Sequence, residues 1–317
     1  MGTVWEMAVW SRERPRALWA LDGAFQEVAR LERLMSRFLP ESQVSQLARA
    51  AGQATVPIDP DLYTLLAQAQ QVAAVSDGAF DVTMGPLVAL WARADLTGVL
   101  PGPAEIRFAK SLVDYRASVL DADGPTAVLQ HAGMSLDLGA IGKGFAVDRA
   151  VERLQAAGYT QGWVNAGGNV RFLGSWDRAV PVRDPKYPDR AFVRLIVEEG
   201  ALATSANYER GWKISGQRYG HLLDPRTGWP ADSGCLSVTV CAPTAALADA
   251  LSTACFVLGP ERSWLLCAVF PKVEALWYMK DNNADQMQLV ITPGINGRVH
   301  DLPALQEEPI HADVSLA

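Results

Sequence analysis

Hydrophobic residues recur at helical spacing over two stretches near the N-terminus. Across 18–35 they fall three or four positions apart, which predicts an amphipathic helix that ends near a turn at 40–42. Across 62–73 the same spacing follows strong start signals, because Asp59 can cap a helix and Pro60 suits its first turn. Both stretches are therefore predicted to be helices that bury one face against a core.

Two further helices are predicted later in the chain. A glycine-rich turn at 137–144 leads into a helix over 145–157, which the glycine that follows should end. The segment 245–258 has apolar residues around most of its circumference, with Thr244 as a possible cap and Gly259 as a stop. The second of these helices is predicted to be largely buried.

Strands and loops are predicted between these helices. Strands are expected at 3–10, 113–120, 127–129, 162–173 (as strand, turn, strand), 192–197, 236–242 and 274–279. Loops are expected at 78–91, 96–103 and 181–188. Because helices and strands alternate, the sequence predicts a mixed α/β (α+β) fold. One domain is expected over 1–302, followed by a loose polar tail at 303–317.

Composition narrows the class of protein. The chain has 317 residues, of which 49% are hydrophobic and 20% charged, so it can bury a sizeable core. Its net charge of −7 argues against a nucleic-acid binder, which needs a basic face to neutralise phosphates. No apolar stretch is long enough to predict a transmembrane helix. Cys255 and Cys267 sit in apolar runs and are predicted to be buried, inert thiols.

The segment 137–144, DLGAIGKG, is the first candidate for chemistry. Its three glycines let backbone N–H groups approach an anion closely at the start of a helix, where negative charge is favoured. Lys143 can add a point charge on a phosphate. The alternative is a plain strand-to-helix turn that needs glycines for its backbone.

Asp249 and Thr253 are the second candidate. They are four residues apart in the predicted helix 245–258 and therefore share one face. A carboxylate and a hydroxyl are hard oxygen ligands of the kind that Mg²⁺ prefers. Two structural alternatives remain open: a solvated polar stripe, or a Thr253 hydroxyl bonded back to the helix carbonyl of Asp249.

Two loops complete the candidate chemistry. Tight-turn dipeptides in 219–230 should present His221 and Arg226 on a rigid loop, and a histidine can take up a proton near neutrality. A purely structural histidine is the alternative. The segment 77–87 places two carboxylates and an aromatic ring beside glycines, which suits either a pocket wall or an ordinary turn in the core.

The order of these segments along the chain resembles the ApbE family of FAD:protein FMN transferases. Eight segments carry the resemblance, at 1–3 (MGT), 35–47 (MSRFLPESQVSQL), 77–91 (DGAFDVTMGPLVALW), 137–150 (DLGAIGKGFAVDRA), 164–174 (VNAGGNVRFLG), 203–210 (ATSANYER), 219–230 (YGHLLDPRTGWP) and 237–259 (SVTVCAPTAALADALSTACFVLG). Any one of them is a weak signal. Eight in the same order make an accidental similarity improbable.

The resemblance implies a two-subdomain fold that binds FAD between its subdomains, together with a divalent metal, usually Mg²⁺. The implied reaction moves the FMN half of FAD onto a threonine, sometimes a serine, of an acceptor flavoprotein, forming a phosphoester and releasing AMP. The resemblance places FAD contacts on Met1, Phe38, Ala79, Phe80, Asp81 and Lys143, metal ligands on the Ala140 carbonyl, Asp249 and Thr253, and an acid–base role on His221. Because an alcohol is a weak nucleophile, a catalytic base is expected, which is either His221 or Asp249 acting through the metal shell.

The same pocket residues suit two alternatives. In an FAD pyrophosphatase water replaces the acceptor hydroxyl and the products are FMN and AMP. In a non-catalytic protein FAD is bound without being cleaved. The first residues do not read as a secretory leader, which predicts a cytoplasmic protein, or a periplasmic or membrane-anchored one if a leader was removed.

Overall fold

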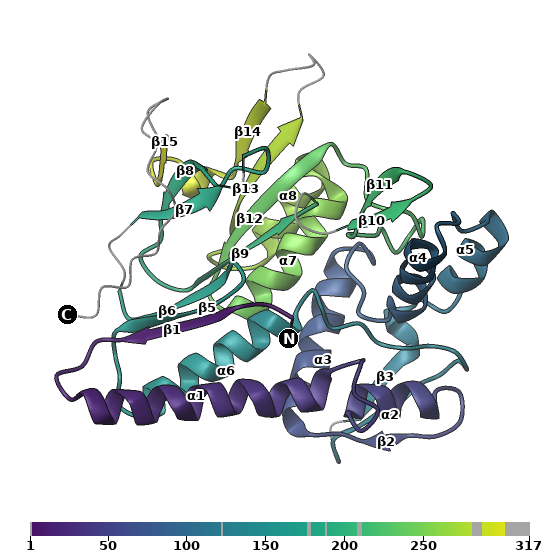
Figure 1. Ribbon diagram of the computed structural model, residues 1–317, viewed down its shortest axis with the longest axis horizontal. Helices are drawn as coiled ribbons and strands as arrows, with labels where there is room; N and C mark the ends of the chain where they lie inside the picture. The colour runs from purple at the N-terminus through teal and green to yellow at the C-terminus, as the bar shows by residue number, and fades with distance from the viewer. Residues whose placement is uncertain are drawn as a thin grey trace.

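A seven-stranded antiparallel sheet forms the centre of the molecule (Figure 1). The computed structural model describes residues 2–121, 123–175, 179–187, 189–207, 211–280 and 287–301. In spatial order the strands of the sheet are β1 (Trp5–Val9), β5 (Gly162–Ala166), β6 (Asn169–Leu173), β9 (Ala201–Ala206), β12 (Cys235–Ala242), β13 (Glu274–Lys280) and β14 (Met287–Ile291). Successive residues of a strand point to opposite faces, so both faces of this sheet need cover.

Helices cover one face of the sheet and a small sheet covers part of the other. Along β9, Ala201 and Ala203 face the helices, whereas Leu202 packs with Val193 and Leu195 of the small sheet. Figure 1 shows α6 and α7 against the large sheet, with α1 lying along α6. These elements are α1 (Arg14–Met35), α6 (Gly142–Ala156), α7 (Ala245–Leu258), α8 (Pro260–Val269), β7 (Ala179–Arg183), β8 (Ala191–Ile196) and β15 (Val299–Asp301).

The remaining elements form the other side of the molecule, at the right and lower right of Figure 1. They comprise a three-stranded sheet, the hairpin β10–β11 and four helices. Their bounds are α2 (Gln43–Ala50), β2 (Val56–Pro57), α3 (Pro60–Val75), α4 (Gly85–Thr97), α5 (Pro103–Lys110), β3 (Ser118–Asp121), β4 (Thr126–Leu129), β10 (Gly211–Ile214) and β11 (Gln217–Gly220), with a 3₁₀ turn at Tyr115–Ala117. A second 3₁₀ turn, Pro293–Ile295, lies beside β13, where Ile295 packs with the small sheet. The predicted mixed α/β fold is confirmed.

Start signals in the sequence place α3 and α7 where they were predicted. The Asp59 carboxylate accepts a hydrogen bond from the Asp61 N–H at 2.8 Å, and Pro60 occupies the first turn of α3. All six of the apolar residues predicted to face inward from α3 are buried. At α7 the Thr244 hydroxyl accepts from the Leu247 N–H at 3.3 Å, and Gly259 follows the last helical residue.

The α1 helix was predicted, and the second half of its buried face agrees with the prediction. Val28, Leu31 and Met35 are buried as predicted. In the first half Leu18 and Phe25 are exposed, and Ala20 and Ala24 are buried instead. These smaller side chains allow α1 to lie close to α6, where larger ones would hold the two helices apart. The predicted turn at 40–42 is followed by the unpredicted helix α2, which Ser42 caps.

The connection predicted at 96–103 is confirmed, since α4 ends at Thr97 and α5 begins at Pro103. The predicted loops at 78–91 and 181–188 were wrong in part. The first contains the start of α4, because Pro86 occupies a first turn instead of interrupting a chain segment. In the second, Pro181 belongs to β7, an edge strand, where a missing N–H does not break a hydrogen-bond ladder. The predicted strand at 113–120 is shorter and starts at Ser118. The predicted tail at 303–317 lies outside the described residues.

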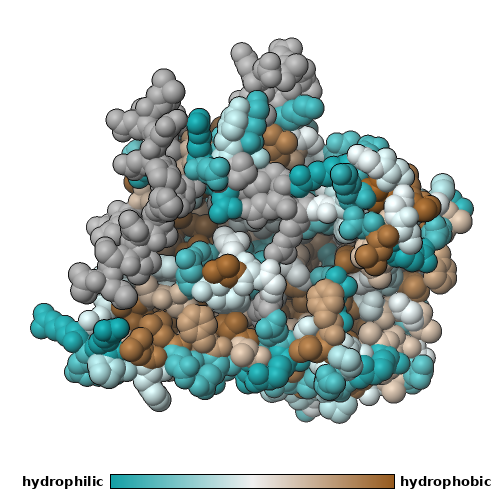
Figure 2. All heavy atoms as spheres, viewed as in Figure 1, coloured by the Kyte–Doolittle hydropathy of each residue, from teal (hydrophilic) through white to brown (hydrophobic). Residues whose placement is uncertain are grey.

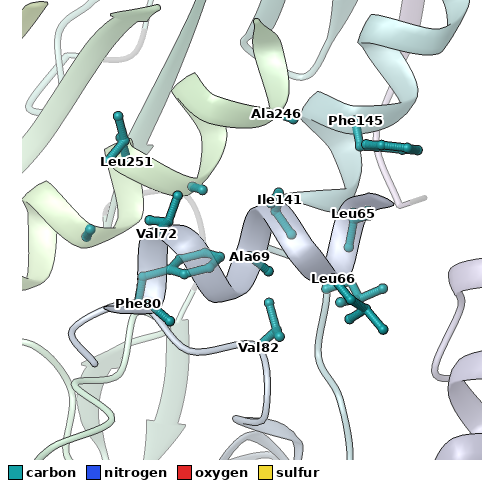
Figure 3. Close-up of a cluster of buried hydrophobic side chains, with 14 of the residues drawn as sticks. Leu65, Leu66, Ala69, Val72, Phe80, Val82, Ile141, Phe145, Ala246 and Leu251 are labelled. Carbon is teal, nitrogen blue, oxygen red and sulfur yellow. The ribbon is translucent and has the colours of Figure 1, made fainter. Parts of the chain in front are cut away.

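The largest buried cluster joins α3 to the starts of α6 and α7. Figure 3 shows Phe80 and Val82 beside Val72 and Ala69 of α3, with Ile141 next to them. Cys255 and Cys267 are buried as predicted. The contact with Cys267, together with burial, raises the pKa of the Cys255 thiol well above its ordinary value. Within the part of the chain described here, no helix combines the length and the apolar character needed to cross a bilayer.

A buried carboxylate ties α1 to its neighbours. Glu27 is almost fully buried and accepts from Arg30 at 2.7 Å and from Arg153 of α6 at 3.2 Å. Hydrogen bonding from Arg30 lowers the pKa of Glu27 below its ordinary value of 4.5, against the opposing effect of burial. Arg30 also pairs with Asp61 of α3, so this network connects three helices.

We expect Glu27→Gln to lower the free energy of unfolding by about 2 kcal/mol at pH 7, because the charged hydrogen bonds are lost. The folded pKa lies below the unfolded one, so Glu27 stabilises fully above pH 4.5 and loses its contribution as the pH falls through the folded pKa. The cost of Glu27→Gln is measured by urea unfolding at pH 7 and at a pH below the folded pKa of Glu27. The control is the same substitution at an exposed position, Glu13→Gln. An equal cost at acid pH would contradict the assignment.

Candidate functional site

The first turns of α6 and α7 lie against each other at the edge of the core. A Cβ on Gly144 would come within 2.2 Å of the Ala245 carbonyl oxygen, so only glycine permits this approach. The Asp148 carboxylate accepts from the N–H groups of Ala245 and Ala246 at 2.8 and 2.9 Å, and Arg171 of β6 donates to it at 2.7 Å. The start of α7 is thereby fixed against α6.

Asp148 is a buried charge whose partners are all provided by the fold. Burial raises the pKa of its carboxyl, while Arg171 and the two α7 amides act in the opposite direction. A carboxylate at a helix N-terminus also interacts favourably with the helix dipole. Asp148 therefore positions α7, the helix that carries Asp249 and Thr253.

Asp249 of α7 makes polar contacts with the first turn of α6. Its side chain is buried, with 4% of the residue exposed, and accepts from the Gly144 N–H at 3.0 Å. The Lys143 ammonium lies 3.4 Å from both carboxylate oxygens and donates to the Gly139 carbonyl at 2.7 Å. The glycine-rich turn and the α7 carboxylate, predicted as two separate candidates, thus bring a cation and an anion to one place.

The amides of the glycine-rich turn are used within the protein. The Gly142 N–H donates to the Leu138 carbonyl at 2.7 Å, and the Gly144 N–H donates to Asp249. The two glycine N–H groups that were expected to face an anion therefore already have acceptors. The positive group that this turn adds to the site is the Lys143 side chain, which is partly exposed.

Three hydroxyl groups lie close together beside the helical turn that follows Asp249. The Thr253 hydroxyl lies 3.4 Å from the Asp249 carbonyl, the long back-bond that was one structural alternative, and 3.4 Å from the Ser205 hydroxyl of β9. Ser205 and Ser252 make a shorter contact of 2.7 Å. Among the residues with described positions, the Thr253 hydroxyl therefore makes only long contacts, which leaves its oxygen able to accept a further partner.

The candidate ligands named from the sequence carry oxygen atoms of the kind that a hard cation such as Mg²⁺ binds. The candidate donors are the Asp249 carboxylate, the Thr253 hydroxyl and the carbonyl of half-buried Ala140, and all three are of the type that Mg²⁺ binds with water completing its shell. Among the residues that the structure describes, no three His, Cys, Asp or Glu side chains cluster as a metal site. A cation here would accordingly depend on a single carboxylate.

Three of the predicted site segments run side by side. The Asp137 N–H donates to the Val82 carbonyl at 2.8 Å, and the Gly85 N–H donates to the Ser135 carbonyl at 3.2 Å. The Asp137 carboxylate also pairs with Arg37 at 2.9 Å, which brings in the end of α1. The segments 77–87 and 137–144 are therefore neighbours, although some fifty residues separate them in the sequence.

The residues predicted to contact FAD are placed in different ways. Phe38 is 74% exposed, with the Arg37 guanidinium 4.2 Å from its ring centroid, so its ring can stack on a ligand. Ala79 and Phe80 are buried, and the Phe80 ring packs in the core (Figure 3). Contact with a ligand through Phe80 would therefore involve its backbone. Met1 lies outside the described residues.

The Asp81 carboxylate holds the 77–87 segment in place. It accepts from the Thr83 N–H and hydroxyl, both at 2.7 Å, and from the Tyr115 N–H at 2.9 Å. Burial raises the pKa of Asp81, and these hydrogen bonds act against that rise. The geometry gives Asp81 a role in shaping the loop, and its contact with FAD stays a prediction.

His221 is half-buried on a loop that the fold holds rigidly, as the sequence predicted. Arg226 donates to Asp224 at 2.8 Å across the tight turn, and this hydrogen bond raises the pKa of Arg226 above its ordinary value. The Trp91 indole N–H of α4 donates to the Gly228 carbonyl at 3.0 Å. The second predicted side chain, Arg226, is thus occupied in maintaining the loop.

Two groups of residues at the site were not found from the sequence. Asp148 reaches its α7 partners across 97 residues of chain, and Ser205 reaches Ser252 across 47. A helical aspartate and a strand serine carry no local pattern that predicts such contacts. The one available signal was that both lie inside segments that carry the family resemblance.

These features define an α/β protein whose candidate site lies where two helices begin beside a strand. The chain matches the ApbE family over residues 1–277. It therefore belongs to the ApbE family.

Individual relatives agree with this assignment. The FAD:protein FMN transferase of Treponema pallidum (strain Nichols) is 35% identical, over 96% of this chain and 88% of the relative. The FAD:protein FMN transferase of Klebsiella pneumoniae (strain 342) is 33% identical, over 82% of each. The crystal structure of the ApbE protein from Thermotoga maritima MSB8 superposes with a TM-score of 0.82 at 30% identity, covering 94% of this chain and 96% of that one.

Proposed function

We propose that this chain transfers the FMN half of FAD to a threonine or serine hydroxyl of an acceptor flavoprotein, with release of AMP. Two relatives that carry this activity in their names align with most of the chain. The observation that carries the proposal is the contact of Lys143 and Gly144 with Asp249, which places a cation and a buried carboxylate together at the start of two helices.

The reaction has a defined bond balance. The acceptor hydroxyl oxygen bonds to the phosphorus of the FMN half, the bond from that phosphorus to the bridging oxygen breaks, and AMP leaves with that oxygen. The hydroxyl proton has to be taken up by a base. Both oxygens of Asp249 already contact Lys143, so we assign the proton to the half-buried imidazole of His221.

The protein supplies positive charge for the phosphates through Lys143, whose ammonium is held by the Gly139 carbonyl and by Asp249. Asp249, Thr253 and the Ala140 carbonyl are the residues that would hold Mg²⁺. When bound, Mg²⁺ would offset negative charge that develops on the pyrophosphate oxygens. The exposed ring of Phe38 is suited to stacking on an aromatic part of FAD.

The test uses purified protein, FAD, Mg²⁺ and an acceptor domain that carries a flavinylation threonine but no flavin. We expect a fluorescent acceptor band in a denaturing gel, a mass increase equal to FMN on that threonine, and one AMP per adduct. AMP and free FMN without an adduct would instead identify an FAD pyrophosphatase. Tight FAD binding with no AMP would identify a non-catalytic binding protein.

A further inference from the structure

The helices α4 and α5 present a group of exposed apolar side chains. Leu96 is 88% exposed, Val99 67% and Phe108 69%, all within thirteen residues of chain. Figure 2 shows apolar side chains at the right of the molecule, over the region that Figure 1 assigns to α4, α5 and the β10–β11 hairpin. Exposed apolar side chains that lie in one region, as here on two helices in contact and the turn between them, can mark an interaction surface. We refer to Leu96, Val99 and Phe108, with the neighbouring cations Arg107 and Lys110, as the α4–α5 face.

Positive charge surrounds this face in an otherwise acidic protein. The segments 93–110 and 211–220 contain five arginines and lysines against two carboxylates, although the whole chain has a net charge of −7. Both carboxylates have partners within the fold: Glu105 pairs with Arg93, and Asp95 accepts from the Lys213 N–H at 2.7 Å. The face therefore combines apolar anchors with a net positive rim.

The α4–α5 face is joined rigidly to the loop that carries His221. The Ser215 hydroxyl donates to the Gly98 carbonyl at 2.8 Å, and the hairpin β10–β11 leads directly into His221. The Trp91 ring of α4 lies 5.4 to 5.6 Å from the rings of three aromatic residues of the hairpin and loop, which are Trp212, Tyr219 and Trp229. A partner bound to the face would therefore be held in a fixed relation to His221.

We propose that the α4–α5 face is where the acceptor protein docks, with apolar side chains and carboxylates around its acceptor hydroxyl. This inference rests on the proposed function. The reaction needs a protein partner to be oriented beside the site, and a positive rim selects one with an acidic surface. A second copy of this chain fits less well, because a symmetric contact through this face would place the cationic rims of the two copies together.

The test compares two double variants of the face with two matched controls. The variants are Leu96→Ser with Phe108→Ser, and Arg107→Glu with Lys110→Glu. The controls make the same kinds of change on α1. Trp19→Ser replaces an apolar side chain that is 74% exposed, and Arg14→Glu reverses an exposed charge. The probe is a purified bacterial flavoprotein domain that carries a flavinylation threonine and was produced without FMN. The Kd of each enzyme variant for this acceptor is measured by surface plasmon resonance without FAD. The KM for the acceptor and the kcat are measured in the transfer reaction.

We expect both face variants to raise the acceptor Kd and KM by about tenfold or more, with kcat and the affinity for FAD within about twofold of the unaltered protein. Unchanged acceptor Kd in both face variants, or an equal rise in the controls, would overturn the proposal. A dimer of the unaltered protein that the face variants dissociate would assign the face to a second copy instead. Binding of the acceptor without any FMN transfer would refute the proposed function but leave the docking surface in place.

Discussion

Asp249→Ala is expected to reduce FMN transfer by about a thousandfold, which corresponds to about 4 kcal/mol of transition-state stabilisation. The substitution removes the only carboxylate among the proposed metal ligands. It also removes the acceptor of the Gly144 N–H and the anionic partner of Lys143. The measurement is the rate of FMN-adduct formation at saturating FAD and acceptor, repeated over a range of Mg²⁺ concentrations.

Two comparisons make this result specific. Asp249→Asn keeps the shape of the side chain and an acceptor for the Gly144 N–H, so its stability should stay closer to that of the unaltered protein while its activity falls to a similar level. Glu261→Ala removes an exposed carboxylate at the start of α8 and should leave the rate unchanged. If Asp249→Ala folds and retains full activity, the proposed metal site is wrong.

The largest effect on stability is expected from Asp148→Ala. This substitution leaves the buried Ala245 and Ala246 N–H groups without their acceptor and the half-buried Arg171 without its ion-pair partner. Breaking a buried ion pair by removing one partner costs about 3 to 5 kcal/mol. Because domains are stable by only about 5 to 15 kcal/mol, such a variant is expected to unfold at much lower urea concentration.

The control for Asp148 lies on the same helix. Glu152 pairs with Arg149 at the surface, so Glu152→Ala should change the free energy of unfolding by no more than about 0.5 kcal/mol. Asp148→Asn retains one acceptor oxygen, so its free energy of unfolding should lie between those of Asp148→Ala and Glu152→Ala. Transfer activity should fall with Asp148→Asn in folded protein, since Asp148 positions α7. Equal stability of Asp148→Ala and Glu152→Ala would show that the α6–α7 contact does not depend on this carboxylate.

The sequence predicted those elements whose boundaries are marked by local chemistry. The caps Asp59 and Thr244 and the apolar periodicity of α3 and α7 are decided within a few residues, and the structure confirms them. Pro86 was misinterpreted, because proline both breaks helices and starts them, and the neighbouring residues do not distinguish the two cases. The buried face was wrong in the first half of α1 because it depends there on the fit to α6, which lies far away in the chain.

The candidate site could be predicted as a set of segments but not as a geometry. Asp249, Thr253, Lys143 and His221 were selected because their side chains suit the chemistry. Their hydrogen bonds could not be predicted, because the partners come from other elements. For example, the Gly142 and Gly144 N–H groups were expected to face an anion but donate to acceptors within the protein. The group left to contact an anion is therefore the Lys143 side chain.

The contact between Lys143 and Asp249 spans 106 residues of chain, and that distance has a consequence for biosynthesis. A ribosome completes the glycine-rich turn long before it reaches α7, so every nascent chain that stops short of α7 has half of the site and none of its carboxylate. Domains generally acquire their long-range contacts only after both partners have been synthesised. Flavin cleavage at this site therefore cannot begin before α7 has been synthesised.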